Sequence, residues 1–386
     1  MDRVAGDYIP GSLASERYRA FVPRPLPPEP ALAFAGSLPT ALERATLALG
    51  RLDGITLMLP DPQIFLYQYV RKEALLSSQI EGTQSSLSDL LLFELQEAPG
   101  VPIDDVVEVS NYVAALAHGL KRMKEGFPLS LRLIKEVHAI LLRQGRGARQ
   151  EPGEFRKNQN WIGGSSPASA SFVPPPPERL DECLNALEKF LHAPDELMPP
   201  LVKAALAHVQ FETIHPFRDG NGRVGRLLIA MILVHNKVLR EPSLYLSLYF
   251  KTNRTRYYEL LNRVRERGDW ETWLEYFLAG VEQTSQQAVD AAQRILGLFA
   301  ADRERVRGLK LKAGSALQVF ERFTRTPILT APQVQRDVPL STPTVLNALK
   351  ELTALGLLHE MTGQRRNRVW LYQAYYDILG EGARPL

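Results

Sequence analysis

The chain has 386 residues, of which 45% are hydrophobic, and it carries a formal net charge of +3 at pH 7. This composition fits a globular protein with two or three domains, and its single cysteine, Cys183, excludes an internal disulfide and indicates a reducing compartment. Neither an apolar signal segment nor a run of membrane-spanning length is present, so we expect a cytoplasmic protein without a membrane partner.

The first part of the chain is predicted to be an extended arm followed by helices. Residues 1–36 are rich in proline and aromatic residues, which predicts an arm across the protein rather than a domain. Apolar periodicity then predicts helices over 38–59, 62–80, 83–93, 104–124 and 129–142.

The middle of the chain changes character before it returns to helices. Residues 143–177 contain many glycines and four consecutive prolines, which exclude helix over most of this stretch. Residues 169–173 have the composition of a strand. Helices are predicted again over 178–190 and 201–214.

A polar turn, His215–Arg226, separates the apolar segments 201–214 and 227–235. Its glycines free the backbone at the start of a helix, where unpaired N–H groups form an anion-binding nest. The arginines add charge for a polyphosphate, and Asn221 can hydrogen-bond a phosphate oxygen. Asp219 can hold a hard cation such as Mg²⁺, and His215 has the intrinsic pKa of a general base near neutrality.

These twelve residues match the Fic family motif, H-x-F-x-[DE]-G-N-G-R-x-x-R, at every defined position. The resemblance implies a mainly α fold, with a Fic-type helical core and a small β-hairpin flap. It also implies a protein adenylyltransferase (AMPylator), a nucleotidyltransferase that uses ATP and Mg²⁺. Such an enzyme transfers AMP to a Ser, Thr or Tyr hydroxyl of a target protein.

The same resemblance assigns roles to single residues. His215 is the catalytic base and Asp219 positions the metal, whereas Phe217 is a buried anchor. Arg223 neutralises the leaving pyrophosphate and Arg226 holds the γ-phosphate. The full set of predicted ATP-binding residues is Gly220, Asn221, Gly222, Arg223, Val224, Gly225, Arg226 and Tyr257.

Two further segments resemble regulatory and target-binding parts of Fic proteins. Residues 77–82 (SSQIEG) resemble the inhibitory motif [ST]-x-x-x-E-[GN], so Glu81 is expected to pair with Arg226 and keep the enzyme weakly active. The alternative is a solvated glutamate at a helix end. Residues 153–173 resemble the flap region, which would bind an extended target segment near Phe172 by main-chain hydrogen bonds; the alternative is a proline-stiffened surface loop.

Other histidines and tyrosines have simpler interpretations. His208 could form a metal triad with His215 and Asp219, but we interpret it as a core histidine. Tyr257 and Tyr258 lie where Fic proteins often have a tyrosine beside adenosine, and ordinary packing is the alternative for each.

The last part of the chain is predicted to be a separate module. Helices are expected over 254–264, 271–278 and 281–311. Helices, strands and a basic turn at 363–367 then resemble a C-terminal winged helix-turn-helix, and residues 308–386 hold ten Lys/Arg against six Asp/Glu. We predict four parts: 1–115, the N-terminal arm and inhibitory region; 116–280, the Fic core; 281–311, a connecting helix; and 312–386, the winged-helix domain.

Several alternatives stay open at this point. The C-terminal module predicts a DNA-binding transcriptional regulator as the second function, although winged helices also dock proteins. A Fic protein can use another donor, such as UTP or a phosphocholine-carrying nucleotide, and members with an inhibitory glutamate can also remove AMP. A homodimer is compatible with the sequence.

Overall fold

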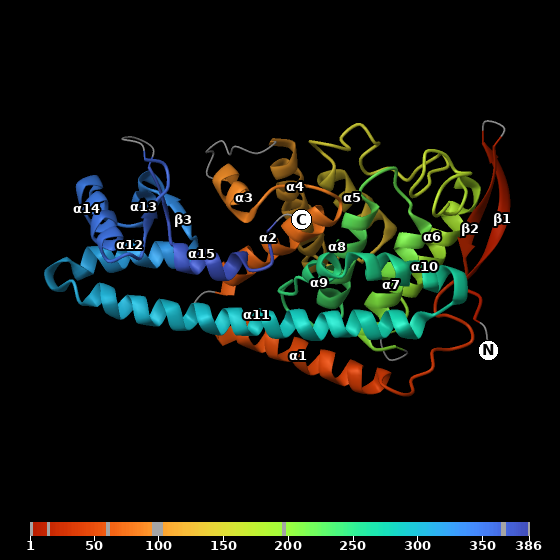
Figure 1. The fold of residues 1–386 in the computed structure, drawn as a ribbon, viewed down its shortest axis with the longest axis horizontal. Helices are drawn as coiled ribbons and strands as arrows, with labels where there is room; N and C mark the ends of the chain where they lie inside the picture. Colours follow the sequence, from red (N-terminus) through yellow and green to blue (C-terminus); the bar gives the residue numbers. More distant parts are fainter. Residues whose placement is uncertain are drawn as a thin grey trace.

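The computed structural model describes residues 3–13, 16–58, 62–94, 103–194, 198–363 and 368–384. Figure 1 shows an elongated, mainly helical molecule in which one long helix, α11, runs from the central helices to the C-terminal region. Within the described residues, no helix is both long enough and apolar enough to cross a membrane.

Most of the central helices agree closely with the sequence prediction because their apolar residues recur at helical spacing, whereas α9 was not predicted. The helices α2, α4, α5, α7, α8 and α9 pack against one another around a shared core. The bounds are α2 (Pro62–Ile80), α3 (Leu87–Glu94), α4 (Ile103–Lys124), α5 (Leu131–Leu141), α6 (Pro177–Leu191), α7 (Pro200–Ile214), α8 (Asn221–His235), α9 (Ser247–Thr252) and α10 (Arg254–Arg267).

The helix α11 (Trp270–Arg307) is continuous, whereas the sequence predicted two helices and a part boundary near residue 280. Gly280 explains the difference. A Cβ atom at Gly280 would lie 2.6 Å from the Tyr249 ring, so the glycine lets α11 approach α9 closely without ending the helix. Along its other side α11 packs on α1 (Leu38–Met58), as Figure 1 shows.

The N-terminal arm contains an antiparallel hairpin that the sequence did not predict. Strands β1 (Gly6–Leu13) and β2 (Glu16–Pro23) pair along their length and project at the end of the molecule far from the C-terminal region (Figure 1). The Phe21 N–H donates a hydrogen bond to the Val173 carbonyl at 2.8 Å, so β2 lies beside the predicted flap.

The predicted flap is an irregular loop with a single β-bridge between Ile162 and Phe172. The Ile162 N–H donates to the Phe172 carbonyl at 2.8 Å, and the Phe172 N–H donates back at 3.2 Å. Phe172 is buried against the Arg265 guanidinium, which lies 3.9 Å from its ring centroid. The hairpin is therefore shorter than its composition suggested.

The C-terminal region contains helices around a three-stranded antiparallel sheet of order β3-β5-β4. Its elements are the short 3-10 helix η2 (Lys310–Lys312), α12 (Ala313–Arg325), β3 (Ile328–Thr330), α13 (Ala331–Asp337), α14 (Thr342–Ala354), β4 (His359–Glu360), β5 (Val369–Leu371) and α15 (Gln373–Gly380). This order of elements is the one expected of a winged helix, although that assignment stays a prediction. Part of the predicted basic turn, residues 364–367, lies outside the described residues.

Candidate active site

The loop between α7 and α8 has an unusual backbone at both ends. His215 ends α7 with a φ of 49°, in the left-handed region that side chains rarely occupy, and Gly220 precedes α8 with a φ of 77°. Such a conformation in a residue other than glycine costs about 1–3 kcal/mol and persists only where surrounding contacts enforce it. The His215 side chain lies with Nδ1 3.3 Å from the Glu212 carbonyl.

Two side chains from the flap region enforce this conformation. The Arg156 guanidinium is buried and donates from Nε to the His215 carbonyl at 2.9 Å, and the Arg156 backbone N–H donates to the Pro216 carbonyl at 2.9 Å. Asn160 donates from Nδ2 to the Phe217 carbonyl at 3.0 Å. The flap region and the histidine loop are therefore one hydrogen-bonded unit.

Phe217 is the buried anchor that the resemblance implied. Its ring is fully buried and stacks on the His138 ring with centroids 3.6 Å apart. His138 accepts a hydrogen bond at Nδ1 from the Gly153 N–H (2.8 Å), so its Nε2 carries the proton and donates to the Asp219 carbonyl (3.0 Å). Burial lowers the pKa of His138 to about 4, so it supports the loop as a neutral group.

Asn221 has a different role from the phosphate contact predicted for its side chain. It is 2% exposed, its Oδ1 accepts from the Phe217 N–H at 2.8 Å, and its Nδ2 donates to the Phe217 carbonyl at 2.9 Å. Both ends of the amide are thus used to close the loop. Its backbone N–H stays at the start of α8, and in the described part of the chain no side chain caps that helix.

Asp219 is placed where a hard cation could reach it. One carboxylate oxygen, Oδ1, accepts from the Gly220 N–H at 2.7 Å, whereas Oδ2 lies 3.8 Å from Arg223. The side chain is 39% exposed. Mg²⁺ binds proteins through one or two carboxylates together with substrate phosphates and water, so a single accessible carboxylate fits such an ion. Among the described residues, no group of three His, Cys, Asp or Glu side chains could hold a metal without a substrate.

Arg223 is held beneath the loop by a partner that the sequence did not reveal. Its Nη1 lies 3.0 Å from Glu108 on α4, and both side chains are nearly completely buried. Glu108 also pairs with Arg146 at 3.1 Å. Burial raises the pKa of Glu108, although both arginines favour its ionised form.

Arg226 makes the predicted ion pair with Glu81. Arg226 is 2% exposed, its Nη2 lies 2.6 Å from Glu81 Oε1, and its Nε donates to the Ser77 hydroxyl at 2.7 Å. Burial opposes ionisation of Glu81, but Arg226 outweighs it and lowers the pKa of that carboxyl. The pairing predicted between these residues is confirmed, and the Ser77 contact explains the first position of the motif.

The Glu81 carboxylate also lies against the first turn of α8. A Cβ atom built on Gly222 would be 2.2 Å from Glu81 Oε1. The carboxylate therefore occupies the place where the free N–H groups and partial positive charge of a helix start would attract an anion.

The matched family regions contain each of these residues. Residues 40–121 match the Fic/DOC family N-terminal region, and residues 128–233 match the Fic/DOC family. The chain belongs to the Fic/DOC family. Its sequence is 27% identical over 239 residues to a protein adenylyltransferase Fic of Nematostella vectensis, and the aligned region covers 62% of this chain and 45% of that protein. It is 31% identical over 209 residues to the Aedes aegypti protein of the same name, and this aligned region covers 53% of this chain and 39% of that protein.

This Fic chain therefore spans less than half the length of these curated relatives. Solved structures support the fold. A Fic family protein from Desulfovibrio desulfuricans G20 has a TM-score of 0.59 at 18% identity and covers 89% of this chain and 98% of that one. Fic-1 from C. elegans has a TM-score of 0.52 at 24% identity and covers 67% and 73%.

The two tyrosines of this Fic chain differ in accessibility. Tyr257 is 1% exposed and its hydroxyl lies 2.8 Å from Nε2 of the buried His208. Tyr257 is therefore packed in the core, and its contact with ATP stays a prediction. Tyr258 is 39% exposed and lies close enough to Arg226 and Glu81 for their charges to act on its hydroxyl. His208 is a core histidine, as we interpreted it.

The buried Arg265 and the Glu212 carbonyl lie beside His215. Arg265 donates to the Glu212 carbonyl at 3.2 Å, and His215 Nδ1 lies 3.3 Å from the same carbonyl. Burial, and then the charge of Arg265, lower the pKa of His215 to about 4, so the imidazole is neutral at pH 7. Burial raises the pKa of Glu212 to about 7.

The site brings together most, but not all, of the predicted residues. The region from His215 to Arg226 meets Glu81, whereas Tyr257 lies in the core. Val224 is fully buried, and a Cβ atom on Gly225 would lie 2.5 Å from Glu212 Oε1, so both serve packing under the helix start. Roles for Glu108, Arg156 and Glu212 were not predicted from the sequence; the one available signal was a charged residue within the apolar pattern of a predicted helix, as at Glu212.

Proposed function

We propose that this Fic protein is a protein adenylyltransferase that transfers AMP from ATP to a Ser, Thr or Tyr hydroxyl of a target protein. The observation that carries the proposal is a neutral histidine held beside an uncapped helix start that bears two buried arginines. The names of the curated relatives support the same activity. The comparisons give no support to the DNA-binding alternative.

His215 would act as the general base. Because its pKa is about 4, the imidazole is unprotonated at physiological pH and can accept the proton of the target hydroxyl. That hydroxyl oxygen would then bond to the α-phosphorus of ATP, and the bond to the bridging oxygen of pyrophosphate would break. The contacts from Arg156 and Asn160 hold the loop for this purpose.

The start of α8 would hold the phosphates. The backbone N–H groups of Asn221 and Gly222 and the charge of Arg226 would bind the oxygens, and Asp219 would ligate Mg²⁺. Magnesium would supply charge neutralisation for the phosphates. Arg223 is too deeply buried against Glu108 to bind pyrophosphate freely, so its contribution would be positive charge beneath the nest.

Glu81 would keep the enzyme weakly active. Its carboxylate contacts Arg226 and crowds Gly222, and the γ-phosphate needs the same position. The target segment would lie along the flap near Phe172. Removal of AMP from the target is a further activity of this site that we propose for the state in which Glu81 is in place.

The experiment is transfer of radiolabelled AMP from ATP to the protein itself and to a lysate. We expect His215→Ala to abolish transfer while ATP binding is retained, and Glu81→Gly to increase transfer. Transfer by His215→Ala would contradict the base assignment. Labelled UTP provides the comparison for the donor nucleotide.

We propose the four-part division given above with α11 as a continuous link, and a winged-helix fold for residues 312–386. The expected cytoplasmic location and a homodimer remain proposals. Size-exclusion chromatography with light scattering tests the dimer, and a salt-dependent gel shift with the full chain tests DNA binding.

A further inference from the structure

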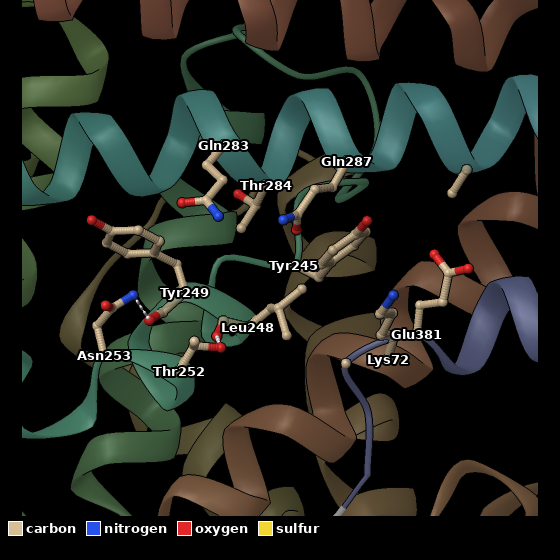
Figure 2. A pocket seen from close by; sticks show the side chains of 12 residues that line it. Lys72, Tyr245, Leu248, Tyr249, Thr252, Asn253, Gln283, Thr284, Gln287 and Glu381 are labelled. Carbon is tan, nitrogen blue, oxygen red and sulfur yellow. Dashed lines mark hydrogen bonds between the residues drawn. The ribbon is translucent and has the colours of Figure 1, made fainter.

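A cavity lies where α2, α9 and α11 meet the segment that follows α15. Its volume is about 330 Å³, within the range of about 300–1,000 Å³ typical of small-molecule sites. Figure 2 shows side chains from α11 on one side and from α9 and α2 on the others, around a shared space. It is lined by residues distinct from the motif and from Glu81.

Lys72 is the charged group of this cavity. It is 5% exposed, and among the described residues its ammonium has no hydrogen-bond or ion-pair partner; it lies 4.5 Å from the Tyr245 ring centroid. Burial lowers the pKa of Lys72 to about 8, but the ammonium still predominates at pH 7. The Tyr245 ring and the charge of Glu381 offset only part of the cost of burying this ammonium. Because a buried charge is costly without a close partner, an anion in the cavity would be favoured.

Glu381 also lines the cavity, but it already has a partner. Both of its carboxylate oxygens accept hydrogen bonds from Arg294, at 2.6 and 2.9 Å. Lys72, Glu381 and Arg294 together leave one positive charge. This balance favours a ligand with a single anionic group and disfavours a cationic ligand.

The rest of the lining offers neutral hydrogen-bonding groups. Gln283 and Gln287 on α11 direct their amides into the cavity in Figure 2, and neither amide has a partner among the described residues. Asn253 donates from Nδ2 to the Tyr249 carbonyl at 3.0 Å, which leaves its Oδ1 for a donor. Uncommitted amides of this kind match ligand hydroxyl groups.

We propose that this cavity binds a small hydroxylated organic anion, with its carboxylate or phosphate against the Lys72 ammonium and its hydroxyls against the amides of Gln283 and Gln287. Tyr245 and Leu248 supply the apolar part of the wall.

Hydrogen bonds connect the segment beside the cavity to Gln79, which precedes Glu81 by two residues. Its lining residue Gly382 continues into Ala383, whose carbonyl accepts from Gln79 Nε2 at 3.1 Å. Gln79 Oε1 accepts from Lys251 at 2.6 Å, and the same ammonium donates to the Arg384 carbonyl. Gln79 is two residues from Glu81, and Lys72 lies on the same helix, so an anion bound at Lys72 would act on the helix that ends next to Glu81.

This connection gives the bound anion a role, which rests on the proposed inhibition by Glu81. An anion in the cavity stabilises the arrangement in which Glu81 contacts Arg226. It therefore lowers the affinity for ATP, and by linkage ATP lowers the affinity for the anion by the same factor.

The first experiment measures binding without nucleotide. The full chain is titrated calorimetrically with gluconate, with glucose 6-phosphate and with neutral glucose. We expect at least one of the two anions to bind and glucose not to bind; which anion binds distinguishes carboxylate from phosphate. Lys72→Met keeps the apolar stem and should weaken binding at least tenfold, whereas Lys189→Met, on the exposed face of α6, should not.

Two results would overturn the site. One is that neither anion binds, and the other is that Lys72→Met binds as tightly as the unchanged protein. If Lys72→Met fails to fold, the double variant Gln283→Ala and Gln287→Ala on the surface of α11 replaces it, with an expected loss of at least threefold; unchanged affinity would again refute the site.

The second experiment measures the connection. In a His215→Ala background, a saturating anion should lower the affinity for MgATP at least threefold, and the added change Glu81→Gly should remove this effect. An ATP affinity that the anion does not change would refute the connection. Failure of AMP transfer itself would leave the binding result unaffected, because no catalysis is involved.

Discussion

The contact between Glu81 and Arg226 leads to a quantitative prediction for ATP affinity. Arg226 is 2% exposed and Glu81 is 34% exposed, with 2.6 Å between Nη2 and Oε1. Removing one partner of a buried pair costs about 3–5 kcal/mol. Solvent at Glu81 and the two hydrogen bonds that Arg226 retains with Ser77 reduce the value to about 2 kcal/mol.

ATP must break the contact between Glu81 and Arg226 to bind, so the free energy of that contact weakens ATP binding by the same amount. About 2 kcal/mol corresponds to roughly a 30-fold change in Kd. We therefore expect Glu81→Gly to tighten MgATP binding by about 10- to 100-fold. Because Glu81 lies in the turn after α2, the glycine does not interrupt the helix.

The assay is calorimetric titration of MgATP in a His215→Ala background, which avoids turnover. Glu81→Gln keeps an acceptor for Arg226 without the charge and should give an intermediate affinity. Glu259→Gln removes an exposed glutamate that lies 3.4 Å from Arg256 and serves as the matched control. Affinities for Glu81→Gly within threefold of the parent would refute the competition between Glu81 and the nucleotide.

Four further variants test the roles of side chains around the loop. The pKa of Glu212 is raised to about 7, so its contribution to stability is present below about pH 4.5 and lost as the pH rises through 7. In urea melts, the free energy of unfolding of Glu212→Gln relative to the parent should therefore be up to about 3 kcal/mol higher at pH 8 than at pH 5. An equal difference between variant and parent at both pH values would contradict this. Asn221→Asp sets a carboxylate against the Phe217 carbonyl and should destabilise the nucleotide-free protein by about 1–3 kcal/mol in thermal melts, which a residue that binds only phosphate would not do. Tyr258→Ala should weaken ATP binding several-fold with little loss of stability. Tyr257→Phe, in contrast, should lower the melting temperature without changing ATP affinity. The reverse pattern would support Tyr257 as the ATP-binding tyrosine.

The sequence predicted the helices of the core well because each contains a long apolar stripe, and α2 was predicted with its observed bounds. It failed where tertiary contacts override local signals. Separate helices were predicted on either side of Gly280, but this glycine permits close packing within one continuous helix. The proline-rich composition of residues 1–36 predicted an extended arm, whereas β1 and β2 form a hairpin there.

In the candidate site, too, the motif was predictable from the sequence but the tertiary contacts of its side chains were not. The residues from His215 to Arg226 and their pairing with Glu81 followed from a long motif. The side-chain directions did not, because two adjacent tyrosines on one helix point to different environments. Asn221 was assigned to phosphate because the sequence cannot show that Phe217 already satisfies both ends of its amide.

The continuity of α11 has a mechanical consequence. Its 38 residues make a rod of about 57 Å at 1.5 Å per residue, so a tilt of about 5° at one end displaces the other by roughly 5 Å. The C-terminal region at the far end of this rod is not free to swing, because Gln79 holds the Ala383 carbonyl beside the core. A partner that binds the C-terminal region and shifts it would therefore act on the contact between Ala383 and Gln79, two residues from Glu81.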